Sequence, residues 1–462
     1  MSDSRTLPLE PWAWLEAFNE TWVAGLVPAA AERLRAERLS SLLAHAVAAS
    51  PFYRARAHGP RLADFAPVDK TELMQHFDDW ATDRRITRSA AAAFIGDRTR
   101  VADAWLGKYL VWTSSGTSGV PGWFVQDAAS LAAYDAIDAL RLRPSPMAVM
   151  PSTASAVLGF GDRFAFIGAS GGHFAGSVNL QRLARSVPPL LRPALHLLSV
   201  QKPVPLIADE LQTLRPTVLI SYPSCVAALA ALQRCGALNL RLREIWLGGE
   251  QLSGEQRREI QAAFGCTLRN NYGASEFFSI AWECAEGRLH VNDDWVVLEP
   301  VDEHARPVPD GRLSHAVLLT HLANRVQPLI RYRLEDRIRR LPTRCRCGSA
   351  FTAIEVQGRS ADTLTLRGAR RRPVTILPLA LETAIEEAAH VTQFQVIGRG
   401  DGELELRFEA AVAHPRAAFT LCRAAIDEFL ADHGAAGTRV RWSRAPPLHG
   451  RASGKLRRVI SA

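Results

Sequence analysis

The sequence lacks the features that would place it in a membrane or outside the cell. No apolar run reaches the ~18 residues expected of a membrane-spanning helix. The N-terminus has no basic segment followed by an apolar one, so we expect no secretory signal. The seven cysteines are an odd number and do not form a disulfide framework, which favours a reducing compartment. Together these absences predict a cytoplasmic protein.

Repeats, low-complexity tracts and nucleic-acid-binding signatures are also absent. The net charge of +8 invites a nucleic-acid partner, but the arginines are spread along the chain without a recognition helix, zinc finger or aromatic–basic motif. A basic balance also suits an enzyme that handles nucleotides, coenzyme A or an acidic carrier protein. With 462 residues, 47% of them hydrophobic, the chain can form two or three globular domains. We therefore expect an enzyme with no nucleic-acid partner.

Alternating helical and extended patterns predict an α/β fold. Helices are expected over residues 10–50, 127–142 and 253–265, and strands at 147–150, 164–167, 217–222, 244–247 and 267–272. This rhythm favours a parallel sheet covered by helices, with ligands at the carboxyl ends of the strands.

The rest of the chain predicts two smaller units. Strands without long helices follow residue 285 and indicate a β-rich subdomain, with segments at 289–298, 313–321 and 329–333. After Gly358, strands at 364–366, 393–397, 403–408 and 439–442 and helices at 377–389 and 415–430 predict a compact α+β unit. We expect a large N-terminal domain over 1–357 and a small mobile C-terminal domain over 358–462.

The stretch from Thr113 to Gly119 is a candidate phosphate-binding loop. It has five hydroxyl side chains and two glycines, and it follows an apolar run. Glycines allow close backbone approach, and N–H groups with hydroxyls can surround phosphate oxygens. It is not a Walker A loop, and a flexible linker would have a similar composition. The candidate ligands are Ser114, Ser115, Gly116, Thr117, Ser118 and Gly119.

A second candidate stretch, Asn271–Glu276, lies where a predicted strand ends. The ring of Tyr272 can flank a nucleotide base, Gly273 permits close approach, and Glu276 can hold a divalent cation; Ser275 lies among them. An ordinary exit from a strand into a loop would look the same.

Two further stretches carry charges suited to a nucleotide. The apolar strand at 329–333 is followed by Asp336, whose carboxylate can bind ribose hydroxyls, although solvated surface charge is the alternative. Near the C-terminus, Lys455 lies in a glycine-rich tail that can reach another domain and stabilise a polyphosphate transition state. The alternative there is a disordered basic tail.

Together with Gly358–Asp362, these stretches resemble in their order the adenylate-forming superfamily of acyl-CoA synthetases and adenylation domains, and most of all its phenylacetate–CoA ligase-like branch. Other segments also look like that branch, namely Ser50–Tyr53, Asp69–Asp78, Gly171–His173, Tyr222–Ser224 and Gly248–Glu250. The resemblance runs from about residue 50 to residue 460. Each motif is weak by itself, but their order and spacing together are specific.

The resemblance implies a two-step reaction. A carboxylate attacks the α-phosphate of Mg-ATP to give acyl-AMP and pyrophosphate, and a thiol then displaces AMP to form a thioester. By this resemblance the loop 114–119 would hold the β- and γ-phosphates, Tyr272 would lie by adenine, Glu276 would bind Mg²⁺, Asp336 and Arg359 would address the ribose, and Lys455 would serve adenylation. The small domain would rotate about residues 359–362.

The resemblance also implies the substrate and acceptor sites. Gly249 and Glu250 are expected at the nucleotide, and the acyl pocket is expected at His173, Tyr222, Ser224 and Gly248. The acid is expected to be aromatic. A basic patch formed by Arg367, Arg370, Arg371 and Arg372 could meet the phosphates of coenzyme A or an acidic acyl carrier protein, or be a solvated loop. The residues leave the choice of acceptor open.

Three departures from the family pattern are visible. The loop's proline, Pro121, is followed by Gly122 rather than lysine; the residues before Asp336 are Arg333-Leu334-Glu335; and Ala361 occupies the usual hinge position. An enzyme with an amine or hydroxyl acceptor and a degenerate nucleotide-binding protein stay open as alternatives. The presence of Lys455, Glu276 and Asp336 argues against degeneracy.

A structural zinc site is a further hypothesis. Cys345 and Cys347 form a thiol pair on a tight turn, and Cys284 with His290 could complete a Cys₃His tetrahedron. The C-x-C spacing is tighter than usual, and two reduced cysteines in a hairpin are the alternative.

Overall fold

A computed structural model gives the architecture of the chain. It describes residues 7, 10–114, 121–142, 162–186, 194–357, 364–368, 372–389, 391, 394–400, 402–408, 412, 414–448 and 458–461. Within this part of the chain, no helix is long and apolar enough to cross a membrane.

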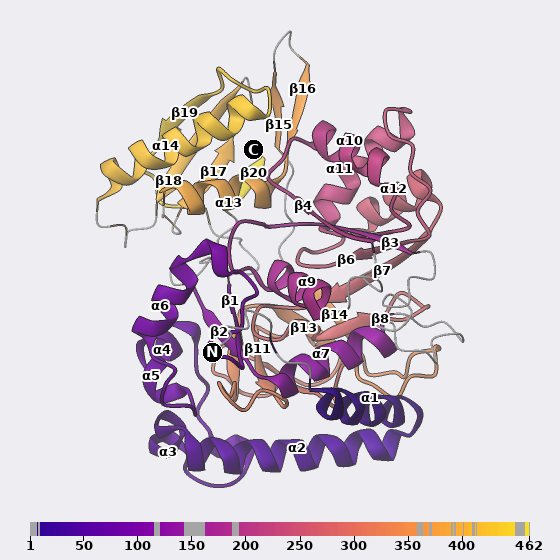
Figure 1. Ribbon diagram of the computed structural model, residues 1–462, viewed down its shortest axis with the longest axis vertical. Helices are drawn as coiled ribbons and strands as arrows, with labels where there is room; N and C mark the ends of the chain where they lie inside the picture. Colours follow the sequence, from indigo (N-terminus) through magenta and orange to yellow (C-terminus); the bar gives the residue numbers. More distant parts are fainter. Residues whose placement is uncertain are drawn as a thin grey trace.

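The first 140 residues are mainly helical and form the lower part of the molecule in Figure 1. The predicted helical stretch 10–50 is divided at Val27, whose extended backbone precedes Pro28. The helices are α1 (Pro11–Leu26), α2 (Pro28–Ala49), α3 (Pro51–Arg56), α4 (Lys70–Gln75), α5 (Phe77–Trp80), α6 (Arg88–Gly96) and α7 (Ala128–Leu140), with short 3₁₀ turns η1 (Leu62–Asp64) and η2 (Arg98–Arg100). An antiparallel pair, β1 (Leu110–Thr113) and β2 (Trp123–Gln126), lies between α6 and α7.

A nine-stranded mixed sheet forms the centre, in the order β13-β14-β9-β8-β7-β6-β5-β3-β4. Its parallel half comprises β3 (Arg163–Gly168), β4 (Ala194–Ser199), β5 (Val218–Ser221), β6 (Glu244–Leu247) and β7 (Thr267–Tyr272). Its antiparallel half comprises β8 (Ala281–Glu283), β9 (Leu289–Val291), β13 (Arg337–Arg340) and β14 (Ala353–Gln357).

Alternate residues of the parallel strands face opposite sides of the sheet. Ala165, Leu219 and Ile245 lie in one apolar core with residues of α10 (Val204–Leu214), α11 (Pro223–Arg234) and α12 (Gly254–Phe264). The intervening positions face the other side, toward α9 (Ala175–Ser186). The capping box of Ser253 and Gln256 starts α12 as the sequence predicts.

The β-rich part between residues 285 and 357 is divided between two sheets. The single strand predicted over 289–298 is wrong, because a turn at Asn292, closed by the N–H of Trp295 (2.8 Å), separates β9 from the next strand. The second sheet has three antiparallel strands, β10 (Val296–Val301), β11 (Ala316–His321) and β12 (Tyr332–Leu334). Residues 147–150, predicted as a strand, lie outside the described residues.

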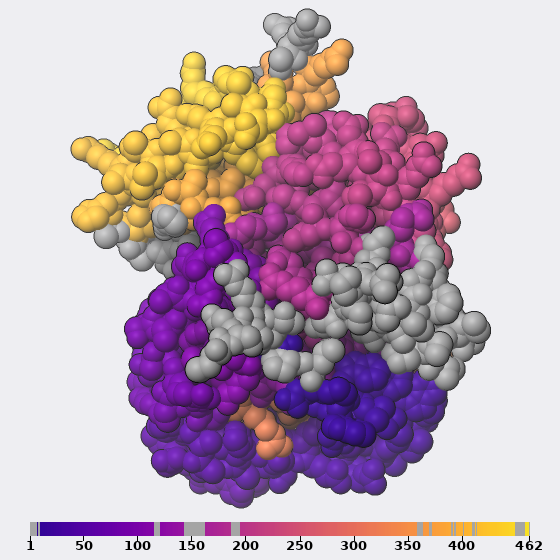
Figure 2. All heavy atoms as spheres, in the orientation of Figure 1, coloured from indigo at the N-terminus to yellow at the C-terminus, as the bar shows by residue number. Residues whose placement is uncertain are grey.

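The C-terminal part contains both strands and helices. It comprises the hairpin β15 (Leu364–Arg367) and β16 (Pro373–Ile376), the four-stranded sheet β17 (Phe394–Gly398), β18 (Glu403–Phe408), β19 (Arg439–Trp442) and β20 (Val459–Ser461), and the helices α13 (Pro378–Ala389) and α14 (Pro415–Asp432). It lies against the segment that carries β4 and α10 (Figure 2). Gln201 donates to Glu387 across this contact at 3.1 Å.

The α/β class is confirmed by this architecture. The division at residues 357/358 and the mobility of the C-terminal part stay predictions, since residues 358–363 lie outside the described part. The sequence did not predict the strands β1, β2, β4, β8, β13, β14, β16 and β20.

A buried ion pair connects the N-terminal helices to the sheets. Arg141, directly after α7, donates to both carboxylate oxygens of Asp294 at 2.7 and 2.6 Å and to the amide oxygen of Asn292 at 2.6 Å. The Arg141 and Asp294 side chains are 4% and 0% exposed. The pair therefore holds the turn between β9 and β10.

We expect Arg141→Ala to lower the free energy of unfolding by about 3–5 kcal/mol, because it leaves a buried carboxylate unpaired. The matched control is Arg288→Ala, which breaks a surface pair with Glu355 whose side chains are 48% and 45% exposed. That change should cost about 0–1 kcal/mol. Equal costs in urea denaturation would contradict the assignment of the Arg141 pair as a structural connection.

Candidate functional site

A cleft of about 1060 Å³ lies at the carboxyl ends of the parallel strands. The residues that follow β5, β6 and β7, namely Tyr222, Gly248 and Gly273, all line it. Parallel strands bring such segments to one edge of a sheet, which is where α/β proteins bind ligands. The predicted site residues that line the cleft are Ser114, Tyr222, Gly248, Gly249, Glu250, Tyr272, Gly273, Ser275, Glu276 and Asp336.

Two residues predicted at a nucleotide are direct neighbours. The hydroxyl of Tyr272 donates to Asp336 Oδ2 at 3.0 Å, although 64 residues separate them. Burial, followed by the nearby Asp336 carboxylate, raises the pKa of Tyr272 well above its usual value, so the hydroxyl keeps its proton and acts as a donor. An aromatic face and a carboxylate are thereby presented side by side in the cleft.

Glu276 is a buried carboxylate in the same cleft. Its side chain accepts a hydrogen bond from the hydroxyl of Tyr332 at 2.7 Å, and the residue is 7% exposed. Burial raises the pKa of Glu276, while the Tyr332 hydroxyl and the charge of Lys70 act in the opposite direction. A carboxylate that is buried despite the free-energy cost of desolvating its charge is typical of a cation-binding or catalytic position.

Lys70 reaches the cleft through backbone pairing. Val68 forms a parallel bridge with Tyr332, in which the N–H of Arg333 donates to the Val68 carbonyl at 2.8 Å. This pairing holds the start of α4 beside the strand that carries Tyr332. Lys70 therefore lines the cleft with Glu276 and Asp336.

Close packing explains two glycines of the cleft. Gly249 has φ +78°, and a Cβ there would come 2.8 Å from the ring of Tyr222. A Cβ on Gly273 would come 2.0 Å from the carbonyl oxygen of Phe278. Both positions therefore require glycine.

Ser224 and His173 do not line the cleft, unlike the prediction for an acyl pocket. The N–H and the hydroxyl of Ser224 both donate to the Glu250 carboxylate at 3.0 Å, so Ser224 positions Glu250. His173 is 2% exposed, and its ring packs against Phe94 with centroids 5.2 Å apart. Its carbonyl accepts from the N–H of Thr113 at 2.7 Å, so His173 connects to the cleft through its backbone.

The phosphate-loop stretch is only partly described. Ser114 and Gly122 form two hydrogen bonds with each other. The N–H of Ser114 donates to the Gly122 carbonyl at 2.8 Å, and the N–H of Gly122 donates to the Ser114 hydroxyl at 2.9 Å. These bonds continue the β1–β2 pairing up to the two ends of the loop. The predicted ligands Ser115–Gly119, and also Arg359 and Lys455, lie outside the described residues, and their roles stay predictions.

The predicted acceptor-docking residues lie in the β15–β16 hairpin. Arg367 ends β15 and Arg372 precedes β16, whereas Arg370 and Arg371 lie outside the described residues. The hairpin projects beside α10 (Figure 1). Neither described arginine lines the cleft, so they do not share a site with the candidate nucleotide residues.

One wall of the cleft carries a row of apolar side chains. Phe166, Ile220 and Trp246 are partners in the register of three neighbouring strands and form a row across the sheet. All three line the cleft, opposite Leu180 and Leu183 of α9. Such a surface fits an aromatic or apolar group.

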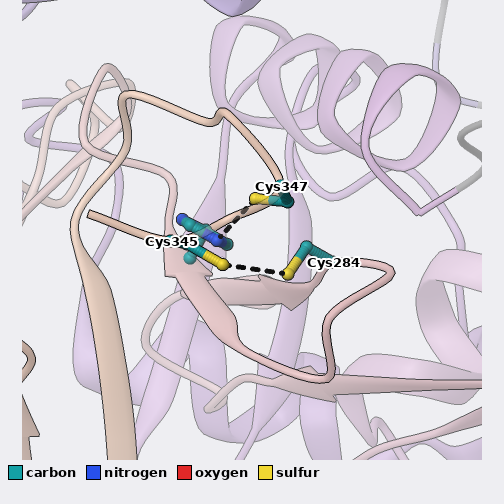
Figure 3. A group of neighbouring side chains, drawn as sticks. Cys284, Cys345 and Cys347 are labelled. Carbon is teal, nitrogen blue, oxygen red and sulfur yellow. Dashed lines mark hydrogen bonds between the residues drawn. The ribbon is translucent and has the colours of Figure 1, made fainter. Parts of the chain in front are cut away.

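The four predicted zinc ligands come together at one point. The ligand atoms of Cys284, His290, Cys345 and Cys347 all lie within 4.8 Å of one another. The Cys284 and Cys345 sulfurs are 3.8 Å apart, and the Cys347 sulfur is 3.3 Å from His290 Nε2. Figure 3 shows the three cysteines converging. His290 Nδ1 bonds to the Phe351 carbonyl at 2.9 Å, which orients the ring so that Nε2 faces the Cys347 sulfur and is placed to bind a metal.

Sequence reasoning assigned no role to several cleft residues. Tyr332 lies in the predicted strand before Asp336, and Lys70 lies in a segment that resembles the family. Asn179 of α9 lies outside the motifs. Period-2 alternation could have identified Tyr332 as inward-facing, but nothing local distinguishes Asn179 from a surface residue.

Comparisons with known proteins agree with these observations. No protein-family model matches the chain. The chain is 30% identical over 247 residues, 51% of its length, to a phenylacetate-coenzyme A ligase of Escherichia coli K12. It is 29% identical over 240 residues, 50% of its length, to a phenylacetate-coenzyme A ligase of Pseudomonas putida. The matched regions span about half the length of these relatives, 52% and 50%. The resemblance to the phenylacetate–CoA ligase-like branch is confirmed by these similarities.

A solved structure shows the same fold over the whole chain. A 2-hydroxyisobutyryl-CoA ligase, solved with 2-HIB-AMP and CoA, superimposes with a TM-score of 0.57 at 22% identity, covering 100% of this chain and 95% of that chain. In its postadenylation state the TM-score is 0.55, with coverages of 94% and 90%. This similarity confirms the fold that the motifs predict.

We expect Glu276→Gln to raise the melting temperature at pH 8. Because burial raises the folded-state pKa of Glu276, the folded protein binds the proton more tightly than the unfolded chain. The favourable contribution of the protonated carboxyl is therefore present at low pH and lost as pH rises through the raised pKa. The gain from the neutral amide should shrink on acidification toward pH 5.

Thermal melts between pH 5 and pH 8 measure this difference. Glu37→Gln is the control, because Glu37 is 63% exposed on α2, and its effect should not vary over this range. A Glu276→Gln effect that is the same at both pH values would contradict the buried-carboxylate assignment.

Proposed function

We propose that this protein activates a carboxylic acid with ATP and transfers the acyl group to a pantetheine thiol, releasing AMP and pyrophosphate. The observation that carries the proposal is the convergence of Ser114, Tyr272, Glu276 and Asp336 on one cleft. These residues come from three separate stretches of the sequence, around residues 114, 272–276 and 336. Similarity to phenylacetate-coenzyme A ligases supports the same reaction.

The cleft residues suggest a division of roles for the first step. Tyr272 would lie by adenine, and Asp336, oriented by the Tyr272 hydroxyl, would accept from the ribose hydroxyls. Glu276 would hold Mg²⁺, which supplies charge neutralisation at the phosphates. Lys455 and the loop 114–119 would address the remaining phosphate charge. Positioning and charge stabilisation are the main sources of rate in such reactions.

The acid would lie on the apolar row of Phe166, Ile220 and Trp246. A surface bordered by two aromatic side chains favours an aromatic acid. In the second step the thiol would attack the acyl carbon and AMP would leave with the bonding electrons. The proposed acceptor is coenzyme A, which the names of the similar ligases contain; a carrier protein is the alternative that the basic hairpin would serve.

A panel of acids assayed for pyrophosphate release tests the function. Each acid is supplied without acceptor, with coenzyme A and with holo carrier protein, so that a non-thiol acceptor would show as turnover without thioester. Lys455→Ala should reduce release strongly. Asp336→Asn should raise the KM for ATP by about 10- to 100-fold, because hydrogen bonds to charged groups contribute about 1.5–3 kcal/mol. No turnover with any acid would overturn the proposal.

We also propose that Cys284, His290, Cys345 and Cys347 bind one structural zinc ion. Three thiolates and one imidazole fill a tetrahedral shell and leave no position for substrate. The site lies between the β8–β9 turn and the loop before β14, so the metal would fasten two parts of the antiparallel half of the sheet. The bond from His290 Nδ1 to the Phe351 carbonyl supplies the support that metal-binding histidines usually have.

Elemental analysis of purified protein should show one zinc per chain. Cys347→Ser should lose the metal and lower the melting temperature, since metal binding contributes to folding. Cys235→Ser is the control, because Cys235 is an exposed cysteine outside the cluster. Absence of zinc, with unchanged stability after chelation, would remove this part of the proposal.

A further inference from the structure

Asn179 lines the cleft, and its surroundings fix which way its amide points. It is 4% exposed and lies on α9 in the wall of the cleft. Arg182 donates to its oxygen Oδ1 twice, from Nε at 3.2 Å and from Nη2 at 2.9 Å. A guanidinium has only donors, so the oxygen must face Arg182 and the NH₂ group must face elsewhere.

Arg182 is itself held in place. Its Nη1 donates to Asp135 Oδ2 at 3.0 Å and its Nη2 donates to the other carboxylate oxygen. The two side chains are 6% and 10% exposed. A bidentate pair of this kind has little freedom to rotate, so Asn179 is presented in one orientation.

The amide nitrogen of Asn179 is left as a donor. Within the described part of the chain, no acceptor bonds to Nδ2, although the residue lies in the cleft lining. Nδ2 is accessible from the cleft, so a ligand oxygen that enters the cleft can accept its hydrogen bond.

The position of Asn179 indicates which part of a ligand it would meet. Ala175, Asn179 and Leu183 follow one face of α9 at four-residue spacing and all line the cleft. The helix begins beside β1, where the Thr113 N–H bonds the His173 carbonyl. Asn179 lies about 6 Å farther along the axis, away from the phosphate-loop end of the cleft.

Apolar side chains lie beside Asn179 in the cleft lining, and the Asp135 carboxylate that holds Arg182 lines the cleft as well. Phe166 packs on α9 so closely that a Cβ on Gly176 would come 2.8 Å from its ring. Leu180 and Leu183 flank the amide along the helix. An oriented donor discriminates between ligands, because a ligand without an acceptor leaves the donor without a hydrogen bond.

We infer that Asn179 selects acids whose ring carries an oxygen substituent at the end remote from the carboxylate. This inference rests on the proposed function, which places the reacting carboxylate at the phosphate end of the cleft. The bond formed is N–H···O from Asn179 Nδ2 to a methoxy, hydroxyl or carbonyl oxygen. Asn179 is thus a specificity-determining residue, positioned by Arg182 and Asp135.

The test compares 3- and 4-methoxyphenylacetate with 3- and 4-ethylphenylacetate. Each pair has the same shape, and only the methoxy acid has an acceptor oxygen. For the unaltered protein, kcat/KM for pyrophosphate release should favour the methoxy acid of one pair roughly 3- to 10-fold, the range of a net hydrogen bond. Asn179→Leu should bring this ratio to about one, since it removes the donor.

Asn179→Asp is the second variant, because it keeps an oxygen for Arg182 but replaces the donor with an acceptor. It should lose the methoxy preference and favour the corresponding hydroxy acid over the methoxy acid. Circular dichroism melts check that both variants fold. A merely structural Asn179 would lower the rates for both acids of a pair equally and keep their ratio, which would overturn the inference.

The outcomes separate this inference from the function on which it rests. Equal kcat/KM for the methoxy and ethyl acids in the unaltered protein would overturn the role of Asn179 and leave acid activation standing. No turnover with any acid would overturn both.

Discussion

The parallel register of β3, β5, β6 and β7 is the constraint on which the candidate site depends. Residues of β3, β5 and β6 pair directly, as in the row of Phe166, Ile220 and Trp246. The strands consequently end at one edge, and the segments after β5, β6 and β7 form one wall of the cleft. If the pairing of one strand shifted by one residue, its side chain in the apolar row would face the core instead, and a core residue such as Ala165 or Leu219 would face the cleft.

The site carries more buried charge than stability alone would favour. Glu276 and Glu250 are carboxylates whose pKa values are raised by burial, and each is held by a hydroxyl group, from Tyr332 and Ser224 respectively. Hydroxyl donors lower the cost of ionisation without neutralising the charge. The cleft thereby keeps carboxylates that can bind a cation or donor, whereas buried pairs such as Arg141 with Asp294 are already neutralised and serve the fold.

The antiparallel half of the sheet supports the cleft from the other side. On one side β7 pairs with the parallel strand β6, which belongs to the half of the sheet that contains β3. On its other side β7 pairs with the antiparallel strand β8, where Tyr272 lies opposite Ala281. The same Tyr272 then contacts Asp336, which precedes β13. The cysteine–histidine cluster lies at the β8–β9 turn, so a metal there would stiffen the strands next to β7. Cleft and cluster are thus connected through the sheet.

The sequence by itself determined the order of the motifs and many of the elements. Ser253 and Gln256 started α12, and apolar patterns marked strands such as β5 and β6, because these signals act between residues a few positions apart. Tertiary structure alone decided which residues meet. Tyr272 reaches Asp336, Tyr332 reaches Glu276, and Asn179 is oriented by Arg182 and Asp135, through contacts that depend on strand register and helix packing rather than on local preference. For the same reason the strand expected over 289–298 divides at Asn292, whose neighbour Asp294 pairs with an arginine 153 residues away.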